Sequence, residues 1–204
     1  MPPTATSLQD LYLNKLRMIY DAEQQALQAM PQMLQMANNA ELKQGFERHE
    51  RETEQQVRRL EQIFQSQGQQ AQPVECKPLR AMVQEAQQVA AGIQDPDTLD
   101  AFLVSGAQAI EHHEIAEYGT LRSWAQQLGR EDDAQLLQQT LDEEGNTDKL
   151  LTRVAEGFVN RRAAKGGERQ VAQGAVRESG ASAGGAGGSG RATSPGAGDE
   201  ASRR

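Results

Sequence analysis

Residues 108–121 read QAIEHHEIAEYGTL, and this stretch places two carboxylates where a helix should be apolar. At helical spacing, Ile110 and Tyr118 lie on one stripe, and Glu111 and Glu114 fall on that same stripe. A carboxylate on the buried face of a helix is costly unless another group compensates its charge. The stretch therefore predicts a helix with a compensating group opposite its two glutamates.

The remaining composition is typical of an all-α protein. Residues 1–162 are mostly Gln, Ala, Leu and Glu, and no segment alternates Val, Ile and Thr as a strand would. The net charge of −8 argues against nonspecific nucleic-acid binding by these residues. Cys76 is alone, which excludes an internal disulfide and fits a reducing compartment. No apolar run spans a bilayer and no signal peptide is apparent, so we expect a soluble, cytoplasmic protein.

Periodicity and capping residues predict four long helices and one short helix. The first long helix begins at Ser7 with a capping-box-like start and breaks at residues 38–39. Pro31 inside this helix is expected to bend it or to end its regular part. The other predicted helices span residues 40–67, 78–91 (the short one), 97–128 and 131–161.

The lengths of the connections predict the topology. Very short loops make each pair of long helices an antiparallel hairpin, and a connection of about thirty residues joins the hairpins. This layout is a ferritin-like four-helix bundle, over residues 1–162, with a long crossover that contains the short helix. Residues 163–204 are rich in Gly, Ala and Ser, and we expect a disordered tail. Its net charge of +2 allows at most a weak contact with nucleic acid.

Each long helix carries a glutamate on or beside its apolar stripe, near its own midpoint. Glu23 and Glu52 are 29 residues apart in the first hairpin, and Glu114 and Glu144 are 30 apart in the second. Antiparallel hairpins with short loops bring helix midpoints side by side. The spacing therefore predicts that four helices deliver carboxylates to one level of one core.

Carboxylates gathered in a dry core would repel one another and raise their pKa values steeply. Two divalent cations resolve this repulsion, and hard oxygen ligands suit iron or manganese. A single glutamate on an apolar stripe most often extends its carboxyl group to water. Four glutamates at the same level of a helical bundle instead favour a site for a pair of metal ions.

Several neighbouring side chains leave two roles open. His49, one turn before Glu52, either binds metal or holds a glutamate in place. Tyr20 either hydrogen-bonds a ligand carboxylate or belongs to the core. His112 lies on a face of small residues, where we expect it to pack or to support a ligand, and His113 is expected to be exposed.

Four segments together resemble the motifs of the YciF-like family of ferritin-like proteins, over about residues 7–160. These segments are YDAEQQAL (20–27), HERET (49–53), EHHEIAEYGTL (111–121) and LDEEGNTD (141–148). The resemblance implies a ferritin-like bundle, often dimeric, with a di-metal centre and an association with stress. It implies metal ligands at Glu23, Glu52, Glu111, Glu114 and Glu144, with His49 and Asp148 nearby.

The sequence departs from the broader ferritin-like pattern at two positions. That pattern carries Glu-x-x-His on two helices, and the matching positions here hold Gln55 and Thr147. Glu111, His49 and Asp148 are candidates to substitute from other positions. The expected site is rich in carboxylate and poor in nitrogen, which still suits iron or manganese.

These observations lead to one main hypothesis and two alternatives. The main hypothesis is a protein with two iron or manganese ions that handles peroxide or oxygen and ferrous iron in oxidative-stress defence. The first alternative is peroxide dismutation of the manganese-catalase type. The second is a non-enzymatic, dimeric helical stress protein whose metal is structural or absent. The expected partners are metal ions, peroxide or oxygen, and a second copy of the chain, without a membrane.

Overall fold

The computed structural model describes residues 5–166, and every regular element in that range is helical. The predicted tail lies outside the described residues, except that the chain stays helical to residue 166. No helix in the described range is long and apolar enough to cross a membrane. The elements are α1 (Leu8–Met36), α2 (Ala40–Ser66), α3 (Lys77–Gly92), α4 (Pro96–Gln127), α5 (Glu131–Val154) and the π-helical turn η1 (Ala155–Val159).

Local capping explains where these helices begin and end. The Ser7 side chain accepts a hydrogen bond from the Asp10 backbone N–H, which caps α1 as predicted. Gly68 and Gly129 follow α2 and α4 with φ of 65° and 68°, a left-handed conformation that favours glycine. Pro31 lies inside α1 without ending it, since the α-helix continues to Met36.

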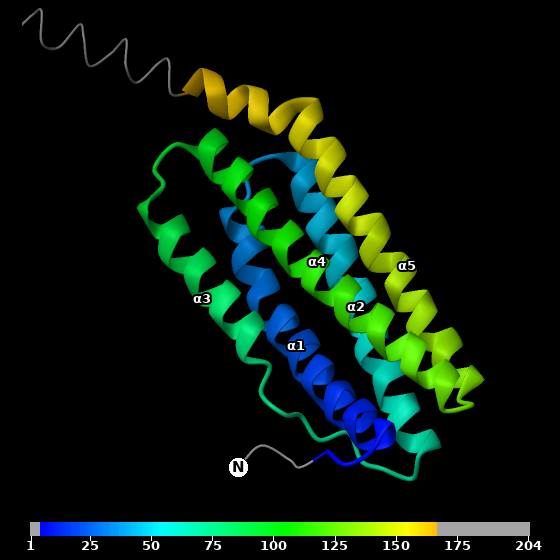
Figure 1. Ribbon diagram of the computed structural model, residues 1–204. Coiled ribbons are helices and arrows are strands. Elements are labelled where there is room, and N and C mark those ends of the chain that lie inside the picture. The colour runs from blue at the N-terminus through cyan, green and yellow to red at the C-terminus, as the bar shows by residue number, and fades with distance from the viewer. Residues whose placement is uncertain (1–4, 167–204) are drawn as a thin grey trace, which may run out of the picture. The chain divides into compact units, whose positions relative to one another are not determined.

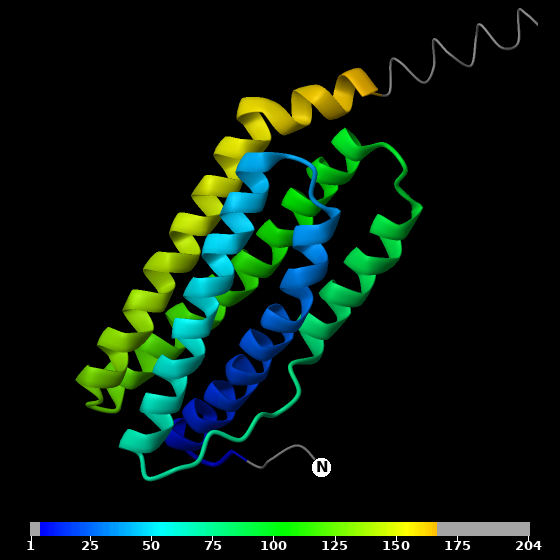
Figure 2. The ribbon, with the colours of Figure 1, turned by 180° about the vertical axis from the view of Figure 1, so that it is seen from behind.

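The helices form the predicted bundle. α1 and α2 make one antiparallel hairpin and α4 and α5 the other, and α2 packs on α5 while α1 packs on α4 (Figure 1). The long connection between the hairpins contains α3, which lies outside the bundle against α1 and α4 (Figure 2). The ferritin-like topology with a long crossover is therefore confirmed.

The two ends of the buried interior are mostly apolar, with Asp100 and Asp133 as buried exceptions, and the charged positions near the helix midpoints lie between these ends. One apolar cluster contains Leu16, Leu60 and Leu137, and the other contains Phe46 and Leu151. Each of the four long helices contributes to both clusters. The charged positions therefore lie between two apolar clusters, a location that keeps water away from them.

The apolar stripe predicted for residues 131–161, which contains Leu137, Leu141 and Leu151 at helical spacing, does not continue to the end of this helical segment. Continuing that stripe at helical spacing places Phe158 in the core, but its side chain is 45% exposed, and Val159 is 2% exposed in its place. The π-helical turn η1 explains the difference, because its wider turn accommodates extra chain and shifts the buried face by about one residue. The expectation for Phe158 is wrong for this reason.

The shift in register predicts unequal effects of two neighbouring substitutions. Val159→Ala should lower the free energy of unfolding by about 2 kcal/mol, because it removes buried methyl groups. Phe158→Ala should cost less than about 0.5 kcal/mol, since that ring lies at the surface. Urea unfolding followed by circular dichroism measures both. A larger cost for Phe158→Ala would show that the buried face does not shift.

Candidate metal centre

The four long helices bring four glutamates and one histidine into the middle of the interior. Glu23 comes from α1, His49 from α2, Glu111 and Glu114 from α4, and Glu144 from α5. All five are at most 5% exposed. The α4 pair lies on one side of its helix because three residues make almost one turn. The glutamates of the opening stretch therefore face acidic residues and a histidine from the other helices.

His49 stands at the centre of this group. Its Nε2 lies 3.3 Å from Oε1 of Glu111, and its Nδ1 lies 3.9 Å from Oε2 of Glu144. His49, Glu111, Glu114 and Glu144 each offer one atom capable of binding metal, and these atoms all lie within 4.8 Å of one another. We call these four residues the His–Glu cluster. A group of this kind could hold a metal ion.

Most polar atoms of the His–Glu cluster have no hydrogen-bond partner outside the cluster, although the carboxyl groups of Glu111 and Glu144 form a hydrogen bond with each other. The atoms without one are Nδ1 of His49, Oε2 of Glu111 and both carboxyl oxygens of Glu114 and of Glu144. Leaving a buried polar group unpaired is costly, and folded proteins rarely tolerate several in one place. The donor set therefore fits a bound cation, which would take up these oxygens as ligands.

Burial shifts the pKa of each of these four glutamates and of His49 toward a neutral side chain. It raises the pKa of Glu23 to about 8 and the pKa of Glu111 to about 9. It raises the pKa of Glu114 and Glu144 well above the usual range for a carboxyl group. Burial lowers the pKa of His49 to about 4, so its imidazole is neutral and can offer a lone pair.

Two tyrosines have different partners. The Tyr118 hydroxyl donates a hydrogen bond to Oε1 of Glu23, which gives one oxygen of that carboxyl group a partner. Burial raises the pKa of Tyr118, so this hydroxyl keeps its proton. Tyr20 donates to Glu61 at 3.0 Å and not to any predicted ligand. Of the two roles left open for Tyr20, the structure favours a core position.

Two predicted ligands lie at the edge of this level. Glu52 is half-buried and hydrogen-bonds with Thr147, one of the residues that replace a ferritin-like histidine. Oδ1 of Asp148 accepts a hydrogen bond from Gln108 at 3.0 Å and also lies 3.3 Å from Nε2 of His112. Neither Glu52 nor Asp148 belongs to the His–Glu cluster.

The two histidines of α4 exchange the environments expected for them. The side chain of His112 is 69% exposed, so it is not packed among small residues. His113 is partly buried, and its Nε2 lies 3.6 Å from Sγ of Cys76 at the start of α3. The reason is the position of α3, which covers the side of α4 that carries His113.

Sequence reasoning missed an ion pair next to the cluster. The Arg59 guanidinium donates to both carboxyl oxygens of Glu143, each at 2.6 Å, and also to Oγ1 of Thr140 at 3.1 Å. Gln56 donates to the same carboxyl group at 3.2 Å. Arg59 and Glu143 each precede a stripe position, Leu60 or Glu144. This position, one residue before the apolar stripe, could have indicated the ion pair, because it places both side chains at the seam between α2 and α5.

This two-pronged pair should stabilise the bundle. Arg59→Met should lower the free energy of unfolding by about 2 kcal/mol, because Glu143 loses two charge-assisted hydrogen bonds at a partly buried seam. The matched control is Arg58→Met, which removes an exposed pair with Glu54 and should cost less than about 0.5 kcal/mol. Chemical denaturation compares the two, and equal losses would contradict this role of Arg59.

Comparison with known proteins places this chain in a family. Residues 7–164 match the family described as "Domain of unknown function (DUF892)". Protein YciF of Escherichia coli strain K12 is 35% identical over 158 residues, which are 77% of this chain and 95% of YciF.

Two solved structures share the fold. YcfI of Rhodopseudomonas palustris, provisionally described as a structural protein, is 41% identical with a TM-score of 0.74. The E. coli stress protein YciF is 34% identical with a TM-score of 0.73. In both cases the match covers 76% of this chain and 99% of the other. The chain therefore belongs to the DUF892 family and is YciF-like in both sequence and fold.

Proposed function

We propose that the chain is a stress protein that binds two iron or manganese ions in the core of its bundle. The ions would serve to handle peroxide or oxygen and ferrous iron. The observation that carries this proposal is the His–Glu cluster with its unpartnered buried oxygens. The stress association comes from the E. coli relative, which is described as a stress protein.

Several buried residues of this chain would bind the ions. Glu111, Glu114 and Glu144 would supply carboxylate ligands and His49 a neutral nitrogen ligand, since all four meet within 4.8 Å. Glu23 is buried at the same level and its charge acts on Glu114 and Glu144, so we assign it to the same site. Predominantly oxygen donors favour iron or manganese over soft metals.

Fewer observations support Glu52 and Asp148 as metal ligands. The half-buried Glu52 reaches the site level from α2, and we assign it a ligand role at the outer side of the pair. Asp148 is already bonded to Gln108, and we assign it a supporting role together with His112. The separate variants Glu52→Gln and Asp148→Asn test this difference through the amount of metal that each variant binds. We expect Glu52→Gln to lose more bound metal than Asp148→Asn.

When bound, the ions would supply the redox chemistry that peroxide, oxygen and ferrous iron require. The surrounding residues prepare the site for it. Tyr118 holds one oxygen of Glu23 and orients that carboxyl group. The two apolar clusters exclude bulk water on both sides of the site, which strengthens electrostatic interactions within it. Neutral His49 keeps its lone pair available at physiological pH.

Metal analysis of the purified chain tests the proposal. The chain is prepared without chelators or a metal-affinity tag, then loaded anaerobically with ferrous or manganous ions and desalted. About two ions per chain are expected, as in other paired carboxylate sites of helical bundles. Retention of iron or of manganese from the host cell indicates which redox assay to apply. Failure to bind either ion would instead favour the non-enzymatic alternative.

A further inference from the structure

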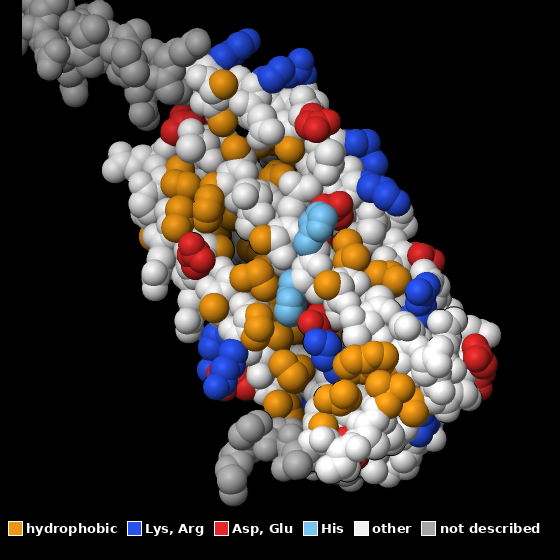
Figure 3. All heavy atoms as spheres, viewed as in Figure 1, with side chains coloured by type: hydrophobic (Ala, Val, Ile, Leu, Met, Phe, Trp, Pro, Cys, Tyr) orange, Lys and Arg blue, Asp and Glu red, His pale blue; other side chains and the backbone are white. Residues whose placement is uncertain are grey.

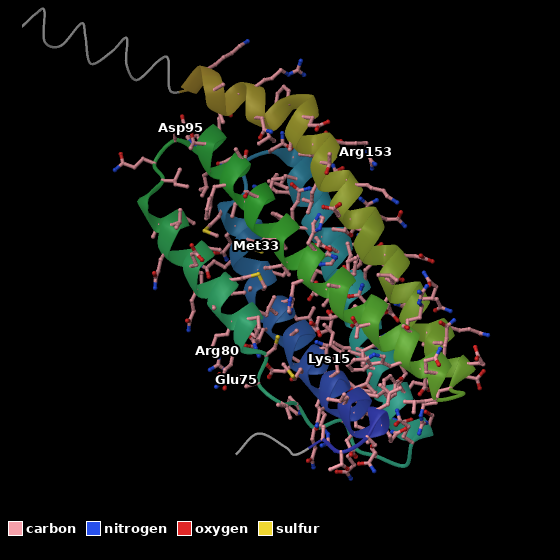
Figure 4. The ribbon with its side chains drawn as sticks, viewed as in Figure 1. Lys15, Met33, Glu75, Arg80, Asp95 and Arg153 are labelled. Atoms are coloured by element: carbon pink, nitrogen blue, oxygen red, sulfur yellow. The ribbon has the colours of Figure 1, made fainter. Side chains whose placement is uncertain are left out.

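An apolar cavity opens on the face of the molecule where α3 lies over α1 and α4. It has a volume of about 30 Å³ and is lined by Met33 of α1, Val83 of α3 and Phe102 of α4, among others. Figure 3 shows apolar side chains gathered on this face around a hollow, and Figure 4 places Met33 between α3 and α4. The only polar side chains in its lining are Gln32 and Gln87, which hydrogen-bond to each other at 3.0 Å.

A second cavity lies beside the first, on the side toward α2. It has a volume of about 20 Å³, and Met30 and Phe46 form part of its apolar wall. His49 and Glu111 of the His–Glu cluster lie in its lining and are its only ionisable residues. The two cavities share four lining residues, which are Ala29, Met33, Ala107 and Ile110.

The lining determines which molecules can use this path. A water molecule in a cavity needs two to four polar partners, and cavities without them stay dry and take up apolar atoms such as xenon. A hydrated cation would lose its shell without compensation along such a wall. Dioxygen is small, uncharged and apolar, so it loses almost nothing on leaving water. Apart from His49 and Glu111 at its inner end, the lining therefore favours dioxygen over ions.

The shared residues also make the path adjustable. Met33 lines both cavities, and its unbranched thioether side chain changes rotamer easily. Ala29 and Ala107 are small, so at the boundary shared by the two cavities only Met33 and Ile110 present long side chains.

We propose that these two cavities form an apolar passage that binds dioxygen and delivers it from the α1–α3–α4 surface to the His49–Glu111 side of the cluster. The delivery of dioxygen to a metal site rests on the proposed function. The binding of an apolar molecule in the passage depends only on its apolar walls. Ferrous ions and peroxide would reach the site by another route, because both are strongly hydrated.

Xenon binding tests the passage independently of any metal. Crystals of the full chain, pressurised with xenon, should show anomalous density at the junction formed by Ala29, Met33 and Ala107. Ala29→Leu should abolish this density, because the added carbons fill the junction. Ala109→Leu adds the same carbons to an exposed position of α4 and should leave the xenon in place. Gly106→Ala is a milder second variant, since its methyl group would contact Ala86 at 3.8 Å without strain, and it should reduce the xenon occupancy.

Reaction kinetics provide the second measurement. In iron-loaded protein at limiting dioxygen, Ala29→Leu should slow the reaction with dioxygen about tenfold, which corresponds to about 1.4 kcal/mol of added barrier. Its metal content and its reaction with hydrogen peroxide should not change. Absence of xenon from the junction, or an unchanged dioxygen rate when Ala29→Leu has removed the xenon, would overturn the passage. Failure of the chain to bind metal would overturn the proposed function and leave the xenon result standing.

Discussion

Replacing Glu114 by glutamine should abolish stable metal binding while the bundle stays folded. Glu114 is 0% exposed, and neither of its carboxyl oxygens has a hydrogen-bond partner, so no structural contact is lost. Glutamine keeps the size of the side chain but removes the charge that attracts a cation. Substituting residues that merely support a metal ligand costs about 10- to 100-fold in affinity, so we expect a loss of about 100-fold or more here.

Anaerobic titration with manganous ions, followed by elemental analysis, measures this loss. Glu54→Gln is the matched control on α2, since the Glu54 side chain is 53% exposed and should bind no metal. Circular dichroism must show that both variants keep the helix content of the original chain. Full metal stoichiometry in Glu114→Gln would remove Glu114 from the ligand set.

Removing the metal should make stability depend strongly on pH. In the metal-free chain the pKa of Glu23 is about 8 and that of Glu111 about 9, against an ordinary value of 4.5. Raised values mean that the folded state binds more protons than the unfolded state between these limits. The contribution of both groups is therefore complete below about pH 4.5 and is lost as pH rises through 8 and 9.

The expected loss is several kcal/mol across this window, because each pKa unit corresponds to about 1.4 kcal/mol. Urea unfolding of the metal-free chain at a series of pH values from 5 to 9 measures it. Metal-loaded protein is the control, since ligands that are ionised in the folded state reverse the trend. A metal-free chain whose stability is flat over this window would show that the glutamates do not share a dry environment.

Most of the fold follows from signals that act over a few residues. Ser7, Gly68 and Gly129 set helix ends through capping and through left-handed backbone, and neither effect depends on distant parts of the chain. The common face of Glu111 and Glu114 on α4 could also be predicted from the sequence, because the two residues are separated by about one helical turn. The end of α5 could not be predicted in this way, since no residue in Ala155–Val159 indicates a π-helical turn.

Pairing across helices was the harder part of the site. His112 and His113 are neighbours in sequence, and only the position of α3 decides which of them is covered. The partnership of Arg59 with Glu143 depends on the rotation of α2 relative to α5, which periodicity does not determine. The sequence predicted the level at which the glutamates meet, but the depth of Glu52 depends on that same rotation.

The distribution of Glu23 and the His–Glu cluster over all four long helices has a consequence for synthesis in the cell. Glu23 and His49 lie in the first hairpin, whereas Glu111, Glu114 and Glu144 lie in the second. A ribosome makes the first hairpin well before Glu144, so the nascent chain displays at most a fragment of the donor set for most of translation. Under the proposed function, metal would be acquired only at the end, when the two hairpins dock, and an incomplete or truncated chain would release redox-active ions rather than hold them.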